Sequence, residues 1–304
     1  MVKIGGGLLA GMLAPGLAFG CACGCGVFDV GTSSMLPSGE GGMAYFSYAY
    51  QDQNRNWSGA AQSSSANNGD KELWTDFFAT GGQYMFNRSW GVEAQIPFAV
   101  RYFKKLDDAG NPVSTTWGSL GDIRLEGHYT GFSPDLSSGV SFGIKLPTGN
   151  DNYNPAVVDR DSQIGTGSTD LLLGGFHRGN LTGDGKWDWF AQTELDVPML
   201  IQAQYRPGVE SDSALGIDYQ GYSLGRVRIS PVAQAIFSFR SHDSGDAANY
   251  NNSGYERLLL SPGIEFHIHP VKIYVDAELP VFQKVNGNQL VAPVLIKASL
   301  SYMF

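Results

Sequence analysis

Charge and hydropathy are both low in this sequence. Only 16% of its 304 residues are charged, and the mean hydropathy of -0.14 is too polar for a bundle of membrane-spanning helices. Glycine and aromatic residues are abundant instead, at 40 glycines and 12% aromatics. A transmembrane β-barrel has this profile, because only alternate residues of its strands face lipid and its interfaces use Tyr, Phe and Trp. We expect a single barrel domain, since barrels of this length commonly form one unit.

Several function classes have no support in the sequence. It contains no H-E-x-x-H zinc motif and no D-x-D-x-D-G calcium loop, and we expect no enzymatic activity. The formal net charge of -9 and the isoelectric point near 5.0 argue against nucleic acid as a partner. An acidic surface of this kind mainly favours solubility and attracts cations.

The C-terminal segment LVAPVLIKASLSYMF, residues 290–304, alternates apolar and polar side chains. Its even positions are apolar, whereas Lys297, Ser299 and Ser301 stand between them, which predicts a strand with one apolar face. It ends on Leu300, Tyr302 and Phe304, a spacing that resembles the C-terminal insertion signal of outer-membrane β-barrels. The predicted partners are therefore outer-membrane lipid and the barrel insertion machinery, and the predicted location is the outer membrane of a Gram-negative bacterium.

The N-terminus predicts export. Residues 1–20 carry Lys3 before a weakly charged apolar run, with small residues at the two cleavage positions before Cys21, which indicates a signal peptide. Processing as a lipoprotein at Cys21 is the alternative. Residues 21–40 are rich in Gly and Cys and are predicted to form a periplasmic or lumenal arm, able to plug the barrel in part, followed by the barrel at 41–304.

Twelve strands are predicted along the barrel, and an even number is required if both chain ends lie on one side of the membrane. Five long polar connections alternate with short turns at 87–89, 133–135, 181–186, 230–231 and 269–270, as in bacterial barrels with long outer loops and tight periplasmic turns. The predicted strands are 41–52, 73–86, 90–103, 119–132, 138–147, 167–178, 187–199, 216–229, 231–242, 255–269, 271–283 and 290–304.

Most predicted strands carry their charged residues on one face. Since an Arg or Lys facing lipid near the middle of the bilayer costs about 2–4 kcal/mol, these charges should face the lumen. They form an ion-paired lining that either borders a narrow aqueous path or holds the wall together. The predicted lumen-lining residues are Arg101, Arg124, Glu126, Lys145, Glu194, Asp196, Arg226, Arg228, Arg240, Arg257, Glu265, Lys272, Asp276, Glu278 and Lys297.

The three cysteines, Cys21, Cys23 and Cys25, all lie in the arm. At alternate positions of an extended segment their thiols share one side, where they are competent ligands for Cu(I) or Zn(II). A disulfide with one remaining or acylated thiol is the alternative in an oxidising compartment. The topology brings three histidines, His128, His267 and His269, to the same periplasmic side, which gives the hypothesis of a metal-binding gate formed by the arm and the rim.

Short motifs recur where predicted strands end. They are KLPTG at 145–149, GTGSTD at 165–170, and the pairs Ile96-Pro97, Val197-Pro198 and Leu279-Pro280. With the aromatic terminus, these motifs resemble the outer-membrane transporters of the meta-pathway phenol-degradation type, which are similar to FadL-type hydrophobic-compound channels. The resemblance implies a channel for small aromatic or hydrophobic molecules without catalytic residues. The cysteine arm is not part of that pattern.

Three functions therefore stay open at the level of the sequence. The first is passive transport of a small-molecule solute, with hydrophobic or aromatic compounds as the expected class. The second is binding or trafficking of Cu or Zn through the cysteine arm. The third is a structural or adhesive surface barrel, to which the loop residues Trp57, Trp117, Tyr205 and Tyr250 are suited.

Overall fold

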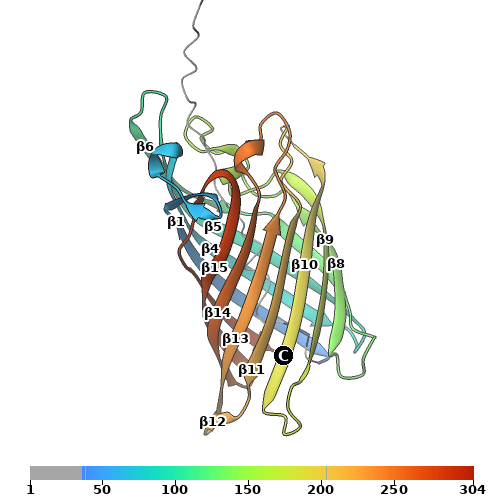
Figure 1. The fold of residues 1–304 in the computed structure, drawn as a ribbon. Coiled ribbons are helices and arrows are strands. Elements are labelled where there is room, and N and C mark those ends of the chain that lie inside the picture. Colours follow the sequence, from blue (N-terminus) through green and yellow to red (C-terminus); the bar gives the residue numbers. More distant parts are fainter. Residues whose placement is uncertain (1–35, 38, 203) are drawn as a thin grey trace, which may run out of the picture.

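The computed structural model describes residues 36–37, 39–202 and 204–304. The predicted signal peptide and the three cysteines lie outside the described residues. Twelve antiparallel strands close into a barrel, which confirms the predicted fold (Figure 1). In order around the barrel these are β1 (Gly41–Gln53), β4 (Asp70–Met85), β5 (Trp90–Leu106), β6 (Pro112–Leu120) continued by β7 (Ile123–Tyr129), β8 (Ser138–Leu146), β9 (Ser168–Asn180), β10 (Trp187–Ile201), β11 (Glu210–Tyr219), β13 (Val227–Arg240), β14 (Tyr255–Ile268), β15 (Val271–Val291) and β16 (Leu295–Met303).

The barrel closes between its first and last strands. β1 pairs with β4 on one side and with β16 on the other. At the seam, the amide of Gly42 donates to the Phe304 carbonyl and the amide of Phe304 donates to the Gly42 carbonyl, each at 2.8 Å. Closure gives the first and last strands of the barrel a partner on both sides, as a membrane-spanning sheet requires.

The two ends of the barrel differ. One end carries short turns, with β12 (Tyr222–Leu224) in one of them, and also holds the seam between Gly42 and Phe304 (Figure 1). The other end carries longer connections that contain β2 (Arg55–Gly59), β3 (Ala61–Gln62) and three single-turn 3-10 helices, η3 (Ser65–Asn67), η4 (Arg160–Ser162) and η5 (Tyr250–Asn252). By analogy with bacterial barrels, the short turns mark the periplasmic end. None of the helices among the described residues is long and apolar enough to cross a bilayer.

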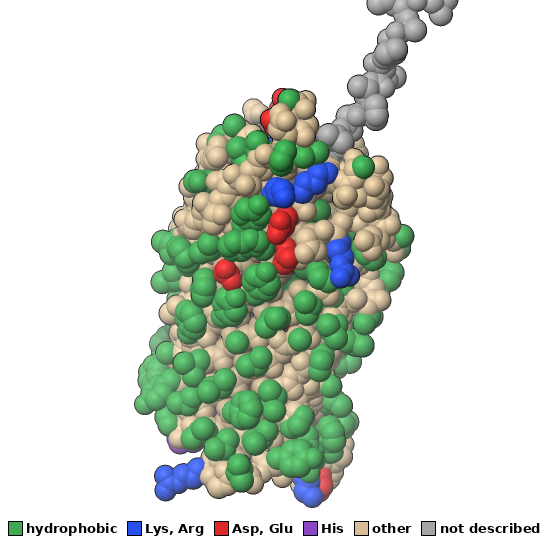
Figure 2. All heavy atoms as spheres, turned by 90° about the vertical axis from the view of Figure 1, so that its left-hand side faces the viewer, with side chains coloured by type: hydrophobic (Ala, Val, Ile, Leu, Met, Phe, Trp, Pro, Cys, Tyr) green, Lys and Arg blue, Asp and Glu red, His purple; other side chains and the backbone are tan. Residues whose placement is uncertain are grey.

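Side chains on the outer wall are largely apolar. Leu300, Tyr302 and Phe304 are 48%, 51% and 68% exposed there, whereas Lys297, Ser299 and Ser301, at the alternate positions of the same strand, are buried inside. Figure 2 shows hydrophobic side chains spread over the wall on the face it presents, with the charged ones in its upper half and at its lower end. Aromatic pairs gather at the periplasmic end, among them Trp90 with Tyr129 and Trp187 with Tyr219. This distribution matches a lipid-facing belt with an aromatic girdle at the interface.

Part of the interior is filled by apolar side chains. A buried apolar cluster joins Ile236, Leu259 and Leu295, each at most 1% exposed, with Phe190 and Phe77 from the facing strands. Phe190 lies over Gly216, where any β-carbon would be within 2.4 Å of its ring. The open space of the lumen is therefore displaced toward the wall made by β5 to β10.

Several strand boundaries differ from the sequence prediction, first among them the turn before β13. The turn expected at 230–231 lies inside β13, and the chain instead turns at 220–226, between β11 and β13. Pro231 falls between the part of β13 that pairs with β12, up to Ile229, and the part that pairs with β11, from Val232. A proline is tolerated there, because on that side the strand has no partner for an amide hydrogen.

The C-terminal strand is shorter than predicted. β16 begins at Leu295, and the segment 288–291 belongs to β15, where it pairs with β2 above the barrel. Leu290 and Ala292 are consequently buried, rather than on the lipid face. Likewise, β5 runs on to Leu106 as a hairpin with β6, so that Ile96-Pro97 does not end a strand.

The terminal aromatic offers a first testable expectation. We propose that Phe304 is part of the insertion signal, and we expect Phe304→Ser to lower the amount of folded barrel in the outer membrane, measured by heat-modifiable migration of the membrane fraction on gels. Phe132→Ser is the matched control, because Phe132 is also an exposed aromatic, at 61%, in the connection between β7 and β8. Equal amounts of folded protein for the two variants would contradict a special role for the terminus.

Candidate functional site

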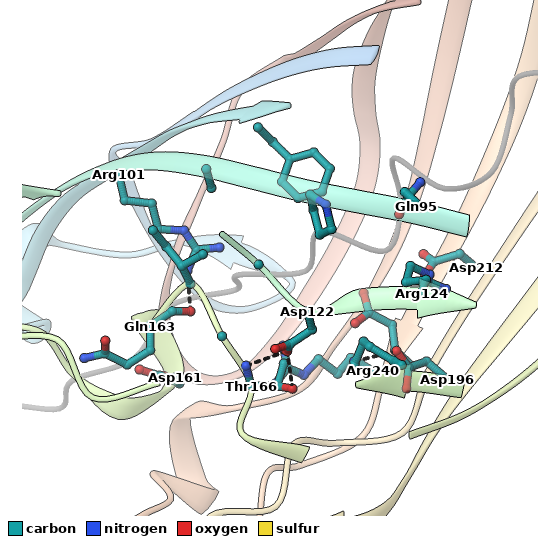
Figure 3. Close-up of a pocket in the computed structure, with 18 of the residues that line it drawn as sticks. Gln95, Arg101, Asp122, Arg124, Asp161, Gln163, Thr166, Asp196, Asp212 and Arg240 are labelled. Atoms are coloured by element: carbon teal, nitrogen blue, oxygen red, sulfur yellow. Dashed lines mark hydrogen bonds and ion pairs between the residues drawn. The ribbon is translucent and has the colours of Figure 1, made fainter. Parts of the chain in front are cut away.

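The lumen contains an upper cavity of about 120 Å³ on the side of the long connections. Charged side chains from β5, β7, β8, β10, β11 and β13 point into it (Figure 3). Aromatic rings contribute little, with Phe77 and Tyr205 among its lining residues. The lining is therefore polar and carries both signs of charge.

The connection between β8 and β9, residues 147–167, folds inward over this cavity. Asp122, at the break between β6 and β7, holds the base of the loop by accepting from the amide of Gly149 at 2.9 Å, from the amide of Thr166 at 2.7 Å and from the Thr166 hydroxyl at 2.6 Å (Figure 3). Gly165 approaches Gly149 so closely that a β-carbon at Gly165 would lie 2.4 Å from the Gly149 backbone. Only glycine fits this contact. The close approach therefore explains Gly149 in the motif KLPTG and Gly165 in the motif GTGSTD.

The tip of the loop is also fixed to the wall. Arg101 donates from Nη1 to the carbonyls of Ser162, at 2.9 Å, and Gln163, at 2.7 Å (Figure 3). Lys105 pairs with Asp159 at 2.7 Å. Val158 is 1% exposed and packs into an apolar cluster with Leu73, Phe103 and Trp117 of the wall. The loop is thus an ordered constriction of the lumen.

Two groups of ion pairs line the wall below the loop. Lys145 on β8 contacts the carboxylates of Asp170 on β9 and Asp196 on β10, the latter at 2.6 Å. Arg124 on β7 contacts Glu194 on β10 and lies 4.0 Å from Glu126. Each base therefore has two carboxylates beside it, and the pairs join four neighbouring strands.

A lower cavity of about 90 Å³ lies on the periplasmic side of these pairs. Gln95, Arg124 and Glu194 line both cavities and so stand between them. Within the lower cavity, Glu93 accepts from the Tyr45 hydroxyl at 2.6 Å and contacts Nε2 of His128 at 3.0 Å.

Leu36 and Pro37 also line the lower cavity, inside the lumen. Leu36 is 7% exposed, and the Pro37 carbonyl accepts from Nη2 of Arg178 at 2.7 Å. These two residues belong to the predicted arm of residues 21–40. The chain leaves the lumen within a few residues, because β1 begins at Gly41 beside Phe304.

A further charged group lies on β14, β15 and β16, and its Lys297 also lines the lower cavity. Lys297 and Glu278 pair at 3.2 Å and are almost fully buried, at 2% and 0% side-chain exposure. Asp276 accepts hydrogen bonds from Gln234 at 3.1 Å, Ser261 at 2.6 Å and Tyr274 at 3.0 Å. Arg257, which is also buried, lies with its guanidinium 4.0 Å above the Tyr255 ring.

The remaining predicted lumen residues lie at the two ends. Near the long connections, Arg240 pairs with Asp243 at 2.8 Å. Burial raises the pKa of Tyr205 well above its usual range, so that its hydroxyl stays protonated and donates to Asp243 at 2.8 Å. At the periplasmic end, Glu265 and Lys272 line a third cavity of about 300 Å³, Arg228 is exposed on β13, and Arg226 is exposed in the turn before it.

The histidines of the metal hypothesis do not converge with one another. His128 lies in the lower cavity with Glu93, whereas Nδ1 of His267 lies 2.6 Å from a nitrogen of Arg228, and the rings of His267 and His269 are 6.4 Å apart. An arginine beside an imidazole nitrogen disfavours a bound cation. Within residues 36–37, 39–202 and 204–304, no group of three His, Cys, Asp or Glu is placed to hold a metal ion.

Three carboxylates stand out that the predicted lumen list lacks, namely Asp122, Asp170 and Glu93. Asp170 ends the GTGSTD motif and pairs with Lys145 of the KLPTG motif, since the two residues are register partners in β8 and β9. The motifs therefore contained a signal, because a Lys and an Asp flanking one long connection meet if that connection joins neighbouring antiparallel strands. Asp122 and Glu93 belong to no such motif, although alternation places them on the same strand faces as Arg124 and Arg101.

Comparison with known proteins identifies relatives by structure alone. No family model matches the chain, and no curated protein matches its sequence. An outer-membrane channel from Pseudomonas putida F1 superimposes with a TM-score of 0.62 at 13% identity, covering 88% of this chain and 97% of that one. The beta domain of the Bordetella autotransporter Brka gives a TM-score of 0.53 at 12% identity, covering 87% and 100%. A FadL homologue from Pseudomonas aeruginosa gives 0.44 at 9% identity, covering 86% and 90%.

These likenesses concern the fold. The chain has the closed barrel of outer-membrane proteins, and its apolar outer wall agrees with that environment. The protein therefore has the fold of outer-membrane β-barrels and an outer wall suited to lipid.

Proposed function

We propose that the barrel is a passive channel for small solutes, without catalysis. The observation that carries this proposal is the succession of cavities along the lumen, lined by charge and narrowed by the inward loop 147–167. A barrel with a purely structural role can fill its interior with side chains, as the apolar cluster does in part of this lumen. Elsewhere this lumen keeps two polar cavities instead.

The lining favours water-soluble over apolar solutes. An aromatic or hydrocarbon molecule gains most from a continuous apolar path, whereas the upper cavity presents Arg101, Arg124, Lys145 and several carboxylates. We therefore propose polar solutes of about amino-acid size as the transported class. The hydrophobic or aromatic compounds implied by the phenol-pathway resemblance are the alternative class.

Swelling of liposomes that contain the refolded mature chain tests this proposal. We expect glycine and a pentose to enter and a trisaccharide of the same osmolarity to be excluded, because the loop and the Arg124–Glu194 pair narrow the path. Liposomes with heat-denatured protein are the control for leakage. Entry of none of these solutes would contradict a channel for polar solutes, and entry of all of them would contradict the constriction.

A further inference from the structure

Several bases of the lumen each lie beside more than one carboxylate. Lys145 lies between Asp170 and Asp196, and Arg124 lies beside Glu194 and Glu126. Each of these two groups holds one positive and two negative side chains. Because the base is in contact with a carboxylate in both, its own field is largely cancelled and one negative charge is left over.

Two more bases in the lumen follow the same pattern. Lys297 pairs with Glu278 at 3.2 Å and is the register partner of Asp276 across β15 and β16. Arg240 pairs with Asp243 at 2.8 Å and is the register partner of Glu210 across β11 and β13. Arg257 is a further buried base that acts on Glu278, so the balance of charge is taken over whole cavities. Six carboxylates line the upper cavity against five Lys and Arg side chains, and three line the lower cavity against two.

The cavities at the two ends of the barrel are also lined by more negative than positive side chains. A cavity of about 480 Å³ at the outer end is lined by five aspartates, against the two bases Lys105 and Arg160. The cavity at the periplasmic end is lined by four carboxylates, against Arg178 and Lys272. A solute that crosses the barrel therefore meets an excess of carboxylates at both entrances and between them.

We propose that this conduit selects cations over anions, and that the surplus carboxylate of each base-centred group, such as Glu126 and Asp196, sets the selectivity. The inference rests on the proposed channel function and names its solute class, small organic or inorganic cations. A low-dielectric channel lined by one sign of charge focuses the field and raises the local concentration of counter-ions. Rings of Asp and Glu are the usual basis of cation selectivity in pores.

The reversal potential of the reconstituted protein in a planar bilayer under a KCl gradient measures this selectivity directly. For the native chain we expect the permeability to K⁺ to be about tenfold higher than that to Cl⁻. This factor is the lower end of the enhancement that electrostatic focusing gives to counter-ions. This first measurement needs no variant. A conducting barrel with equal permeability to the two ions, or with a preference for Cl⁻, would overturn the inference and leave the channel function standing, whereas absence of any current would refute both.

Two double variants test which carboxylates cause the preference for K⁺. Glu126→Gln with Asp196→Asn removes the surplus charge of two groups and leaves each base one carboxylate, so we expect the preference for K⁺ to fall severalfold. The matched control is Glu256→Gln with Asp184→Asn, which removes two exposed carboxylates that line none of the cavities described above. Heat-modifiable migration verifies folding of each variant. An equal change in reversal potential for the two double variants would assign the selectivity to overall charge and contradict a role of the base-centred groups.

Discussion

Replacing residues 151–164 with a short Gly–Ser connection is expected to raise the single-channel conductance of the barrel severalfold. This segment holds the tip of the inward loop, including Val158 and the carbonyls of Ser162 and Gln163 that bind Arg101. The exchange is geometrically mild, because the Gly165 amide already donates to the Asn150 carbonyl at 2.9 Å and a few residues can close the gap. Conductance of the refolded variant in planar bilayers is the measurement.

The matched control shortens a connection that lines no cavity. Residues 182–186 form a largely exposed turn between β9 and β10 at the periplasmic end, in which the Lys186 amide donates to the Asp184 carboxylate at 3.2 Å. Replacement of this turn with Asn-Gly leaves the lumen as it is, so its conductance should equal that of the native chain. If the loop variant folds and conducts no better than this control, the constriction lies elsewhere, and the Arg124–Glu194 pair is the next element to remove.

The barrel itself was predictable from local pattern. In β16, alternation places Ile296, Leu300 and Tyr302 outside and Lys297 inside, because successive side chains of a strand point to opposite faces. Alternation also identifies the lumen side of most strands, since a charge on the lipid side is costly. Both rules act on near neighbours in the chain, so one sequence is enough to apply them.

Strand ends were less predictable, because they depend on the partner strand. Pro231 was interpreted as a turn residue, yet it lies within β13 at a gap in the pairing between β12 and β11. The same limit applies to β15, which continues past the barrel rim because β2 pairs with its last residues. Neither partner can be identified from the composition of the strand itself.

The candidate site required knowledge of three-dimensional contacts. That Arg124 meets Glu194 follows from the positions of β7 and β10, which are separated by two other strands and by a long stretch of sequence. The inward fold of loop 147–167 depends on Asp122, whose place at the break between β6 and β7 has no marker in the sequence. Residue type alone indicated that the lumen is charged, and not which charges pair.

The pairing around Lys145 leads to the largest expected effect on stability. Lys145→Met should lower the free energy of unfolding by about 3 kcal/mol, the scale found when one partner of a buried ion pair is removed. Lys145 is 12% exposed and Asp170 is fully buried, so the variant leaves two carboxylates, those of Asp170 and Asp196, facing each other without a base. Equilibrium unfolding in guanidinium chloride, with the protein in lipid vesicles and followed by tryptophan fluorescence, is the measurement.

Two further variants separate this charge effect from the loss of the side chain itself. Lys145→Met combined with Asp170→Asn and Asp196→Asn removes the uncompensated charge, and we expect it to recover most of the lost stability. Lys284→Met removes a lysine of the outer surface that lies 3.8 Å from Glu256 and is 53% exposed, and its effect should stay within about 0.5 kcal/mol. If the triple variant were as unstable as Lys145→Met alone, the lost packing of the lysine stem would account for the destabilisation. Repulsion between the two uncompensated carboxylates would then not be its cause.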